Sequence, residues 1–225
     1  MNITPDALVY AWLGPLPVSA TLINTWIVMA LLLTLALLGR RQLGDADTPG
    51  PLQNLLEAVV EALRDQLRDI AQQDPAAYLP FVGTLFLFIA VSNLLGVVPG
   101  FEPPTASLST TAALALAVFA AVPWFGIRHS GVRAYFAEYL KPTPLMLPLH
   151  IISELSRTLA LAVRLFGNIM SDSVIIAILL SVAPLIFPVL MHLLGLITGL
   201  LQAYIFAVLA MVYIAAGTAA RPPQS

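Results

Sequence analysis

The chain has 225 residues, of which 59% are hydrophobic and only 10% are charged, and its mean hydropathy is +0.91. Soluble domains contain about 25% charged residues, so this composition excludes an ordinary soluble protein and indicates an integral membrane protein. The net charge of -2 gives no reason to expect nucleic acid as a partner, and the absence of cysteine excludes disulfides and thiolate metal sites.

The chain opens with residues 1–17, which contain Asp6 but no lysine or arginine. A cleaved signal peptide begins with a basic region, so we expect this segment to be retained and to lie outside the membrane. Residues 18–39 are uncharged and long enough to span about 30 Å of hydrocarbon. Arg40 and Arg41 follow at once, so this first helix is predicted to end on the cytoplasmic side.

An amphipathic helix is predicted over residues 52–72. Its apolar residues recur at three- and four-residue steps, namely Leu52, Leu55, Leu56, Val59, Val60, Leu63, Leu67 and Ile70. The opposite face carries Glu57, Glu61, Arg64, Asp65, Arg68 and Asp69. Such a helix lies along the cytoplasmic interface or packs on a partner helix, and we interpret its charges as a solvated face rather than as catalytic groups.

Two further spans are predicted over residues 79–98 and 108–127, joined outside the membrane by residues 100–107. Ser92 and Asn93 are the strongly polar pair of the first of these spans. They are consistent with two roles, hydrogen bonding between helices or lining a channel.

The last part of the chain is predicted to be a long helical hairpin, with arms over residues 150–182 and 189–216 and a corner at residues 183–188. Both arms exceed the roughly 20 residues that a perpendicular span requires, so we expect them to tilt and to wrap around a curved neighbour. Three prolines are expected to break the chain before the hairpin: Pro142, Pro144 and Pro148.

The basic residues set the predicted orientation. Those that fall on one side of this five-crossing topology are Arg40, Arg41, Arg64, Arg68, Arg128, Arg133, Lys141 and Arg221. Because basic residues concentrate on the cytoplasmic side, the N-terminus is predicted outside and the C-terminus inside. The expected fold is therefore one all-α membrane domain over residues 1–225, with five transmembrane helices and one amphipathic interfacial helix.

Arg164 stands in the middle of a long apolar stretch, residues 151–173. A guanidinium cannot shed its charge there, and at the centre of a bilayer it costs at least about 2.5 to 3.5 kcal/mol without a partner or a water-filled cavity. On a helix, Arg157, Asn168 and Ser171 lie within about 60° of Arg164. This polar face indicates an ion pathway, and the alternative is a structural arginine paired with a carboxylate from another helix.

Two acids share an azimuth on the same helix, Glu154 roughly 15 Å before Arg164 and Asp172 roughly 12 Å beyond it. Neither reaches the arginine within this helix. An ionised carboxylate at either depth must be hydrated, so we predict that Glu154 lines a water-accessible position on the cytoplasmic side of Arg164 and Asp172 one on the outer side, with His192 further out. The alternatives are that Glu154 caps the start of the helix and that Asp172 is a structural hydrogen-bond acceptor.

If the hairpin turns near Pro184, residues whose numbers sum to about 369 should face each other. This places Gln202 near Gly167, where it either holds Arg164 or Asn168 in position or makes a plain interhelical hydrogen bond.

Signatures of catalysis are missing from the sequence. It contains no ATP-binding loop, no zinc-type histidine cluster and no nucleophile elbow. We therefore expect a non-catalytic protein without cofactor or metal. The three histidines are dispersed and are more typical of packed or interfacial residues. Two other classes remain, a secondary transporter or channel with its own substrate path, and a purely structural membrane scaffold.

Several motifs carry a family resemblance. They are residues 164–168 (RLFGN), 201–209 (LQAYIFAVL), 212–214 (VYI), 92–99 (SNLLGVVP) and 141–144 (KPTP). The region from about residue 78 to 217 resembles subunit a of the F-type ATP synthase, the membrane stator beside the c-ring, whereas the first 75 residues resemble it only in layout.

This resemblance implies that Arg164 corresponds to the family's essential arginine, Asn168 and Gln202 to its polar neighbours, and Arg157 to a basic position seven residues earlier. The chain also departs from the family. Ser173 stands where an acid is common, next to Asp172. Gly195 stands where some members carry histidine, and residues 104–109 (PTASLS) have Ser107 in place of the acid of the related PT-x-D-x-N motif.

The resemblance further implies a mechanism, in which a carboxylate on each rotating c subunit is held ionised by Arg164 and must release its ion before passing. A continuous pore would bypass rotation, so the mechanism implies two half-channels, with Glu154 in the cytoplasmic one and Asp172 in the outer one. It implies the c-ring, the subunit b peripheral stalk and the remaining subunits of the complex as partners. A bacterial plasma membrane is the expected location. The coupling ion is H⁺ or possibly Na⁺, because the ring's own site makes that choice.

Overall fold

The computed structural model describes residues 9–13, 16–42, 51–71, 75–98, 100–133, 135, 146–182 and 187–218. Six helices make up nearly all of this part of the chain. They are α1 (Ala20–Gln42), α2 (Pro51–Ala71), α3 (Leu79–Leu95), α4 (Leu108–Ser130), α6 (Met146–Val182) and α7 (Phe187–Thr218). Two 3-10 turns are η2 (Pro75–Ala77) and η3 (Pro104–Ala106).

Some of the predicted features lie outside the described residues. These are the first eight residues, the linker at 43–50, residues 183–186 of the hairpin corner, Lys141 and Arg221.

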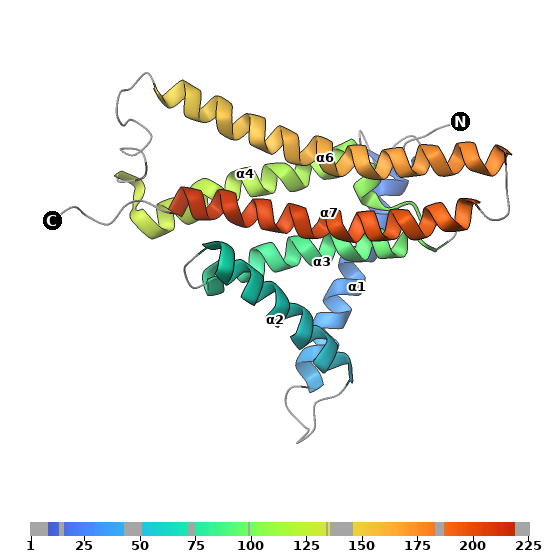
Figure 1. Cartoon of the computed structure of the whole chain (residues 1–225), viewed down its shortest axis with the longest axis horizontal. Helices are drawn as coiled ribbons and strands as arrows, with labels where there is room; N and C mark the ends of the chain where they lie inside the picture. The colour runs from blue at the N-terminus through green and yellow to red at the C-terminus, as the bar shows by residue number, and fades with distance from the viewer. Residues whose placement is uncertain are drawn as a thin grey trace.

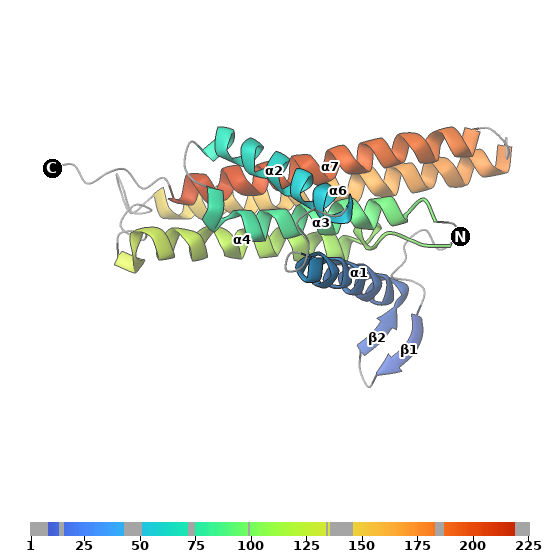
Figure 2. The ribbon, with the colours of Figure 1, turned by 90° about the horizontal axis from the view of Figure 1, so that it is seen from below.

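A short antiparallel hairpin precedes α1. Strand β1 (Val9–Leu13) pairs with β2 (Leu16–Ser19), and the pair projects from the helices beside the start of α1 (Figure 2). This segment was expected outside, and no strands were predicted in it. Its two runs are only five and four residues long, which is too short for a convincing alternating pattern.

Four helices are long and apolar enough to cross a membrane, over Ala20–Gly39, Leu108–Ser130, Pro148–Leu179 and Val189–Thr218. The fifth apolar helix, α3, has 17 residues and is shorter than the predicted span. It ends at Leu95 because the next residues form tight turns, in which the amides of Gly96 and Val98 bond the carbonyls of Asn93 and Leu95.

One predicted boundary is wrong. Pro148 does not break the chain before the arginine helix, because α6 begins at Met146 and Pro148 lies in its first turn. A proline is tolerated there, since the first amides of a helix have no acceptor within it. The helix therefore has 37 residues, which corresponds to about 55 Å.

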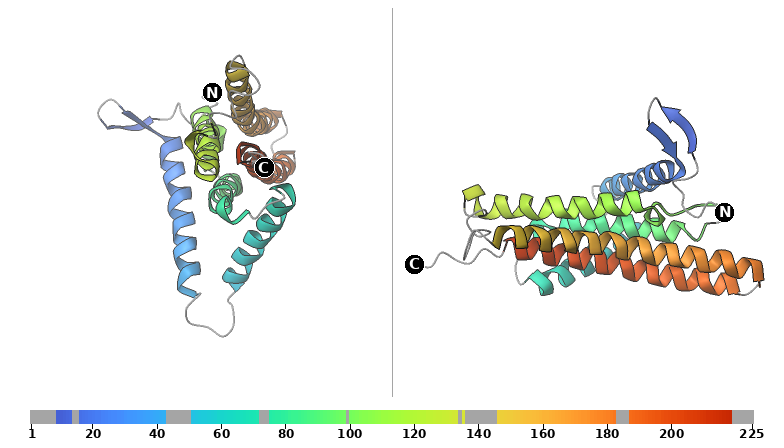
Figure 3. Two further views of the ribbon diagram at one scale, coloured as in Figure 1. Left: turned by 90° about the vertical axis from the view of Figure 1, so that its left-hand side faces the viewer. Right: turned by 90° about the horizontal axis from the view of Figure 1, so that it is seen from above.

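Helices α3, α4, α6 and α7 run side by side, whereas α1 crosses them steeply and α2 runs diagonally across one side (Figure 1). Viewed along the bundle, the four helices form one group from which α1 and α2 splay apart (Figure 3). Helix α7 packs against α2, α3, α4 and α6, and α4 packs against both arms of the hairpin. The core accordingly lies around α7, where Phe206, Met211 and Ile214 are fully buried.

Two glycines allow α4 and α7 to approach closely near one end of the bundle. A Cβ on Gly217 would stand 2.8 Å from a methyl group of Val122, and one on Gly126 would stand 2.9 Å from the Gly217 carbonyl oxygen and within 3 Å of the Tyr135 ring. Small residues at such crossings let helix backbones pack together in membranes. Gly83 of α3, in contrast, faces open space.

We expect Gly126→Ala to destabilise the folded chain by about 1 to 3 kcal/mol, because the added methyl group meets backbone atoms that cannot yield. Gly83→Ala is the matched control, and it should be neutral or stabilising by up to about 1 kcal/mol because alanine favours the helix. Denaturation in detergent, followed by circular dichroism, measures both. Equal stability of the two variants would contradict this account of the α4–α7 contact.

Candidate functional site

The two arginines of α6 lie on the face that the rest of the chain leaves uncovered. The buried residues of this helix face α4 and α7, and they are Thr158, Leu161, Ala162, Leu165 and Ile169. Arg157 and Arg164 are exposed, and so are the apolar side chains of Leu155, Leu159 and Val163 around them. Arg164 thus stands on an apolar surface rather than in the core.

The surroundings of the two arginines differ. The Arg157 guanidinium carbon lies 5.6 Å from the centre of the Tyr213 ring of α7, which is within the range of a cation–π contact. Arg164 forms no ion pair within the part of the chain that the structure describes. The described residues therefore give no support to the alternative that Arg164 is a structural arginine paired with a carboxylate from another helix.

Asn168 lies one turn beyond Arg164 and contacts α7. Its side-chain amide donates a hydrogen bond of 3.3 Å to Oε1 of Gln202. The two residue numbers sum to 370, so the predicted pairing of the hairpin arms is confirmed at this level. Gln202 is only 2% exposed, and its Nε2 has no hydrogen-bond partner in the structure. A buried donor of this kind costs about 1 to 3 kcal/mol unless water or a partner satisfies it.

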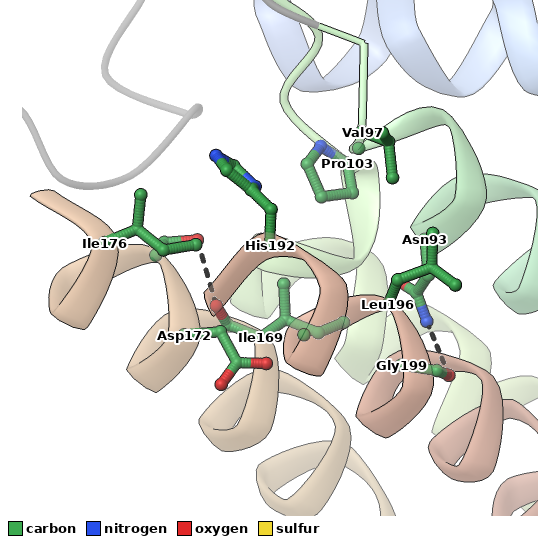
Figure 4. Close-up of a pocket in the computed structure, with 12 residues that line it drawn as sticks. Asn93, Val97, Pro103, Ile169, Asp172, Ile176, His192, Leu196 and Gly199 are labelled. Atoms are coloured by element: carbon green, nitrogen blue, oxygen red, sulfur yellow. Dashed lines mark hydrogen bonds between the residues drawn. The ribbon is translucent and has the colours of Figure 1, made fainter. Parts of the chain in front are cut away.

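A pocket of about 90 Å³ opens one to two turns further along the hairpin, between α3, α6 and α7 (Figure 4). It is lined by Asp172 and Ser173 of α6 and by His192 of α7, among other residues. The Asp172 carboxylate and the His192 imidazole point in different directions (Figure 4). The volume suffices for several waters, since one water requires about 10 to 15 Å³.

Gly195 explains how the Asp172 carboxylate fits between the two arms. A Cβ on Gly195 would stand 3.3 Å from Oδ2 of Asp172, which is tighter than most contacts in proteins. The carboxylate therefore occupies the space beside a residue that has no side chain. The two departures from the family pattern, an acid at 172 and a glycine at 195, are neighbours in space.

Asn93 closes the α3 side of the same pocket. Its side-chain amide donates a 2.8 Å hydrogen bond to the Gly199 carbonyl of α7, and its Oδ1 accepts a 2.8 Å bond from the Thr105 hydroxyl. A Cβ on Gly199 would stand 3.0 Å from the Asn93 side chain, so a larger residue at this position would displace that side chain. The predicted hydrogen bond between helices is therefore confirmed for Asn93, which also lines the pocket, and its role in a channel stays a prediction.

The remaining predicted residues are more dispersed. Glu154 is half-buried, eighteen residues before Asp172, which corresponds to about 27 Å along α6. Ser171 is exposed, and Ser173 lines the pocket while its hydroxyl bonds the Ile169 carbonyl at 2.9 Å. The structure thus brings Asp172, Ser173, His192 and Asn93 together, and it places Glu154 apart.

Gly199 and Thr105 were missed as contributors to the site. A signal for Gly199 was present, since Gly195 and Gly199 form a G-x-x-x-G pattern that marks close helix packing in membranes. Thr105 had no such signal, because its bond to Asn93 depends on how the connection before α4 folds back. No group of three acidic or histidine side chains suited to a metal ion occurs among the described residues.

Comparison of the sequence with known proteins shows the family of this chain. A family model described as "ATP synthase A chain" matches residues 22–215. The chain is 55% identical over 218 residues to ATP synthase subunit a 2 of Acaryochloris marina, covering 97% of this chain and 93% of that protein. It is 52% identical over 224 residues to ATP synthase subunit a of Albidiferax ferrireducens, covering 100% and 97%, respectively. It is 53% identical over 221 residues to ATP synthase subunit a 1 of Chlorobaculum parvum, covering 98% of each. The chain therefore belongs to the ATP synthase subunit a family.

Proposed function

We propose that this chain is the ion-conducting stator subunit of a rotary ATP synthase and that Arg164 faces the carboxylates of the rotating c-ring. The observation that carries this proposal is the exposure of Arg164 on an apolar face of α6 that no other helix of the described chain covers. A permanent charge in such a place requires a partner.

The uncovered surface fits a protein partner of the proposed kind. Exposed apolar side chains flank the arginine on α6, and the neighbouring face of α7 continues them with Leu201, Tyr204 and Ile205. A ring of apolar helices would cover this surface, and a carboxylate on each of them would neutralise Arg164 in turn. The arginine favours the ionised carboxylate, so each carboxylate must release its ion before it passes. The same charge repels free cations and thereby prevents a direct leak.

The arrangement of the helices supports the proposed tilt of the hairpin. Helix α1 crosses the four side-by-side helices steeply (Figure 1), so α1 and these helices cannot all stand perpendicular to one bilayer. The 20 apolar residues of α1 match the bilayer thickness without tilt, whereas α6 and α7 exceed it. We take α1 as the upright span and the other four as tilted spans, which makes five crossings with α3 as the short one.

Ions reach and leave Arg164 through two half-channels in this proposal, since a continuous pore would bypass rotation. The pocket at Asp172, Ser173 and His192 supports the outer half-channel, because these polar side chains line it and it is large enough for water. Gln202 and Asn168 connect this pocket to the arginine along the α6–α7 contact. Glu154, in the opposite direction along α6, belongs to the cytoplasmic half-channel.

The proposed setting is a bacterial plasma membrane with the N-terminus outside and the C-terminus in the cytoplasm. The c-ring, the subunit b peripheral stalk and the other subunits of the complex are the proposed partners. H⁺ is the proposed coupling ion, and Na⁺ is the alternative.

Replacement of Arg164 tests the central assignment. Arg164→Ala should reduce ion-driven ATP synthesis to background while the complex still assembles, because the change removes an exposed charge and adds no bulk. Arg164→Lys should also fail or be severely impaired, since an ammonium lacks the planar fork and loses its proton more easily. Arg133→Ala removes the same charge from the exposed segment after α4 and should retain synthesis. Synthesis by Arg164→Ala in membrane vesicles would refute the assignment.

The proposed topology is tested with reporter fusions. Fusions after Gly39 and Ser225 should report the cytoplasm, whereas a fusion after the exposed Glu102 should report the outside. The physical reason is the concentration of basic residues on one side of the five spans. A cytoplasmic signal from the fusion after Glu102 would overturn the five-crossing topology.

The half-channels are tested by thiol labelling, for which the chain is suited because it contains no cysteine. Glu154→Cys should react with a small water-soluble thiol reagent mainly from the cytoplasm, and Asp172→Cys mainly from outside. Phe206→Cys is the buried control and should not react, since this position is 0% exposed. Labelling of both test positions from the same side, or of neither, would show that the half-channels are wrongly assigned.

A further inference from the structure

A second cavity lies far from Arg164, between the start of α3 and the end of α4. Its volume is about 270 Å³, and it is lined by Ala77, Tyr78, Phe125, Arg128 and His129. This is many times the space of about 10 to 15 Å³ that one water requires, so a larger group fits. Nothing in the proposed ion path uses it.

The inner wall of this cavity is aromatic and rigid. The rings of Tyr78 and Phe125 meet edge to face with their centres 5.2 Å apart, and the ring of Phe81, which does not line the cavity, packs on Phe125 with the ring centres 6.2 Å apart. Tyr78 is only 6% exposed. The rings therefore form a preformed surface that needs little ordering when a ligand binds.

The mouth of the cavity is basic. Arg128 and His129 stand in the last turn of α4 and are both exposed, and none of the five lining residues is acidic. A guanidinium offers a planar fork of donors that matches two oxygens of a phosphate. The charge and the donor geometry both select an anion.

The cavity stands at the end of a candidate span, which sets its depth. Arg128 and His129 lie within the last three residues of the span Leu108–Ser130, and Trp124, one turn before Arg128, is 66% exposed. Exposed tryptophan next to basic residues is the pattern of a membrane–water interface. An occupant therefore meets water at its charged end and lipid chains at the other.

We propose that this cavity binds the phosphate headgroup of an anionic phospholipid, with Arg128 and His129 on the phosphate and the Tyr78–Phe125 wall against the glycerol backbone. A lipid fits better than free phosphate, because the aromatic wall and the exposed Trp124 continue the basic mouth towards the hydrocarbon. Basic pockets between helices on the cytoplasmic side bind such headgroups. The assignment to the cytoplasmic leaflet rests on the topology of the proposed function.

Fluorescence of Trp124 tests this site. In a full-length chain with Trp12→Phe and Trp26→Phe, Trp124 is the only tryptophan. The chain is reconstituted in phosphatidylcholine vesicles with equal fractions of brominated phosphatidylglycerol or brominated phosphatidylcholine, whose bromines quench tryptophan on contact. We expect phosphatidylglycerol to bind about fivefold or more tightly than phosphatidylcholine, because one basic residue near an anionic lipid favours its binding by about that factor.

Three variants separate the site from general surface charge. Arg128→Gln with His129→Gln should reduce the preference to about one. Arg128→Lys retains the charge without the fork and should give an intermediate value. Arg133→Gln is the matched control and should keep the preference, because Arg133 is exposed and basic but does not line the cavity. Equal quenching by both lipids, or equal losses in the Arg133 and Arg128 variants, would overturn the proposal.

Two further measurements identify the ligand and keep this proposal separate from the ion path. Inorganic phosphate at millimolar concentration should not displace the brominated phosphatidylglycerol, and full displacement would show that the cavity is a phosphate site rather than a lipid site. Arg164→Ala should retain the lipid preference. If Arg164→Ala loses ATP synthesis and keeps the lipid preference, both proposals are upheld. If Arg164→Ala retains ATP synthesis, only the proposed ion path is refuted.

Discussion

A guanidinium that cannot lose its charge, placed on an apolar helix face, is the constraint on which the rest of this structure depends. The face of α6 that carries Arg164 has no cover in the described chain, and the opposite face is buried against α4 and α7. No ion pair neutralises this charge within the described residues, and in the proposed function a partner's carboxylate does so. That function requires α6 to be positioned accurately, because the carboxylate has to meet the guanidinium at close range.

Helix α7 provides that accuracy. It is packed against α3, α4 and α6, and it holds its neighbours through small residues and a few buried polar contacts. Gly217 and Gly199 let Val122 and Asn93 approach so closely that a Cβ at either position would displace them, and Gln202 meets Asn168 one turn from Arg164. In a membrane, packing and hydrogen bonds of this kind take the place of the hydrophobic effect between helices. The α3–α7 contact at Asn93 and the α6–α7 contact at Asn168 lie within three residues of each other on α7, so a displacement of one affects the other.

The two ends of the bundle have different chemistry. One end has the pocket with Asp172 and His192, which lies between three helices and is bounded by the Thr105–Asn93–Gly199 contacts. The other end has the basic and aromatic cavity at Tyr78, Phe125 and Arg128. The first suits water and an ion within the protein, and the second suits an anionic group at its surface. This asymmetry fits a protein with a fixed orientation in its membrane.

The sequence by itself determined the membrane class, the helical hairpin and the residues of the polar face, because hydropathy and helical periodicity are local properties that need no partner. It also determined the pairing of Asn168 with Gln202, since two straight arms with one corner leave a single register. Only the tertiary structure decided that Asn93 bonds Gly199 and Thr105, that Asp172 lies beside Gly195, and that Arg128 joins Tyr78 in one cavity. These contacts join residues from 12 to 106 positions apart, and they depend on crossing angles and on the fold of the connection before α4. The strands β1 and β2 and the early start of α6 at Met146 were likewise missed, because short strands and a proline in a first turn leave weak patterns in a sequence.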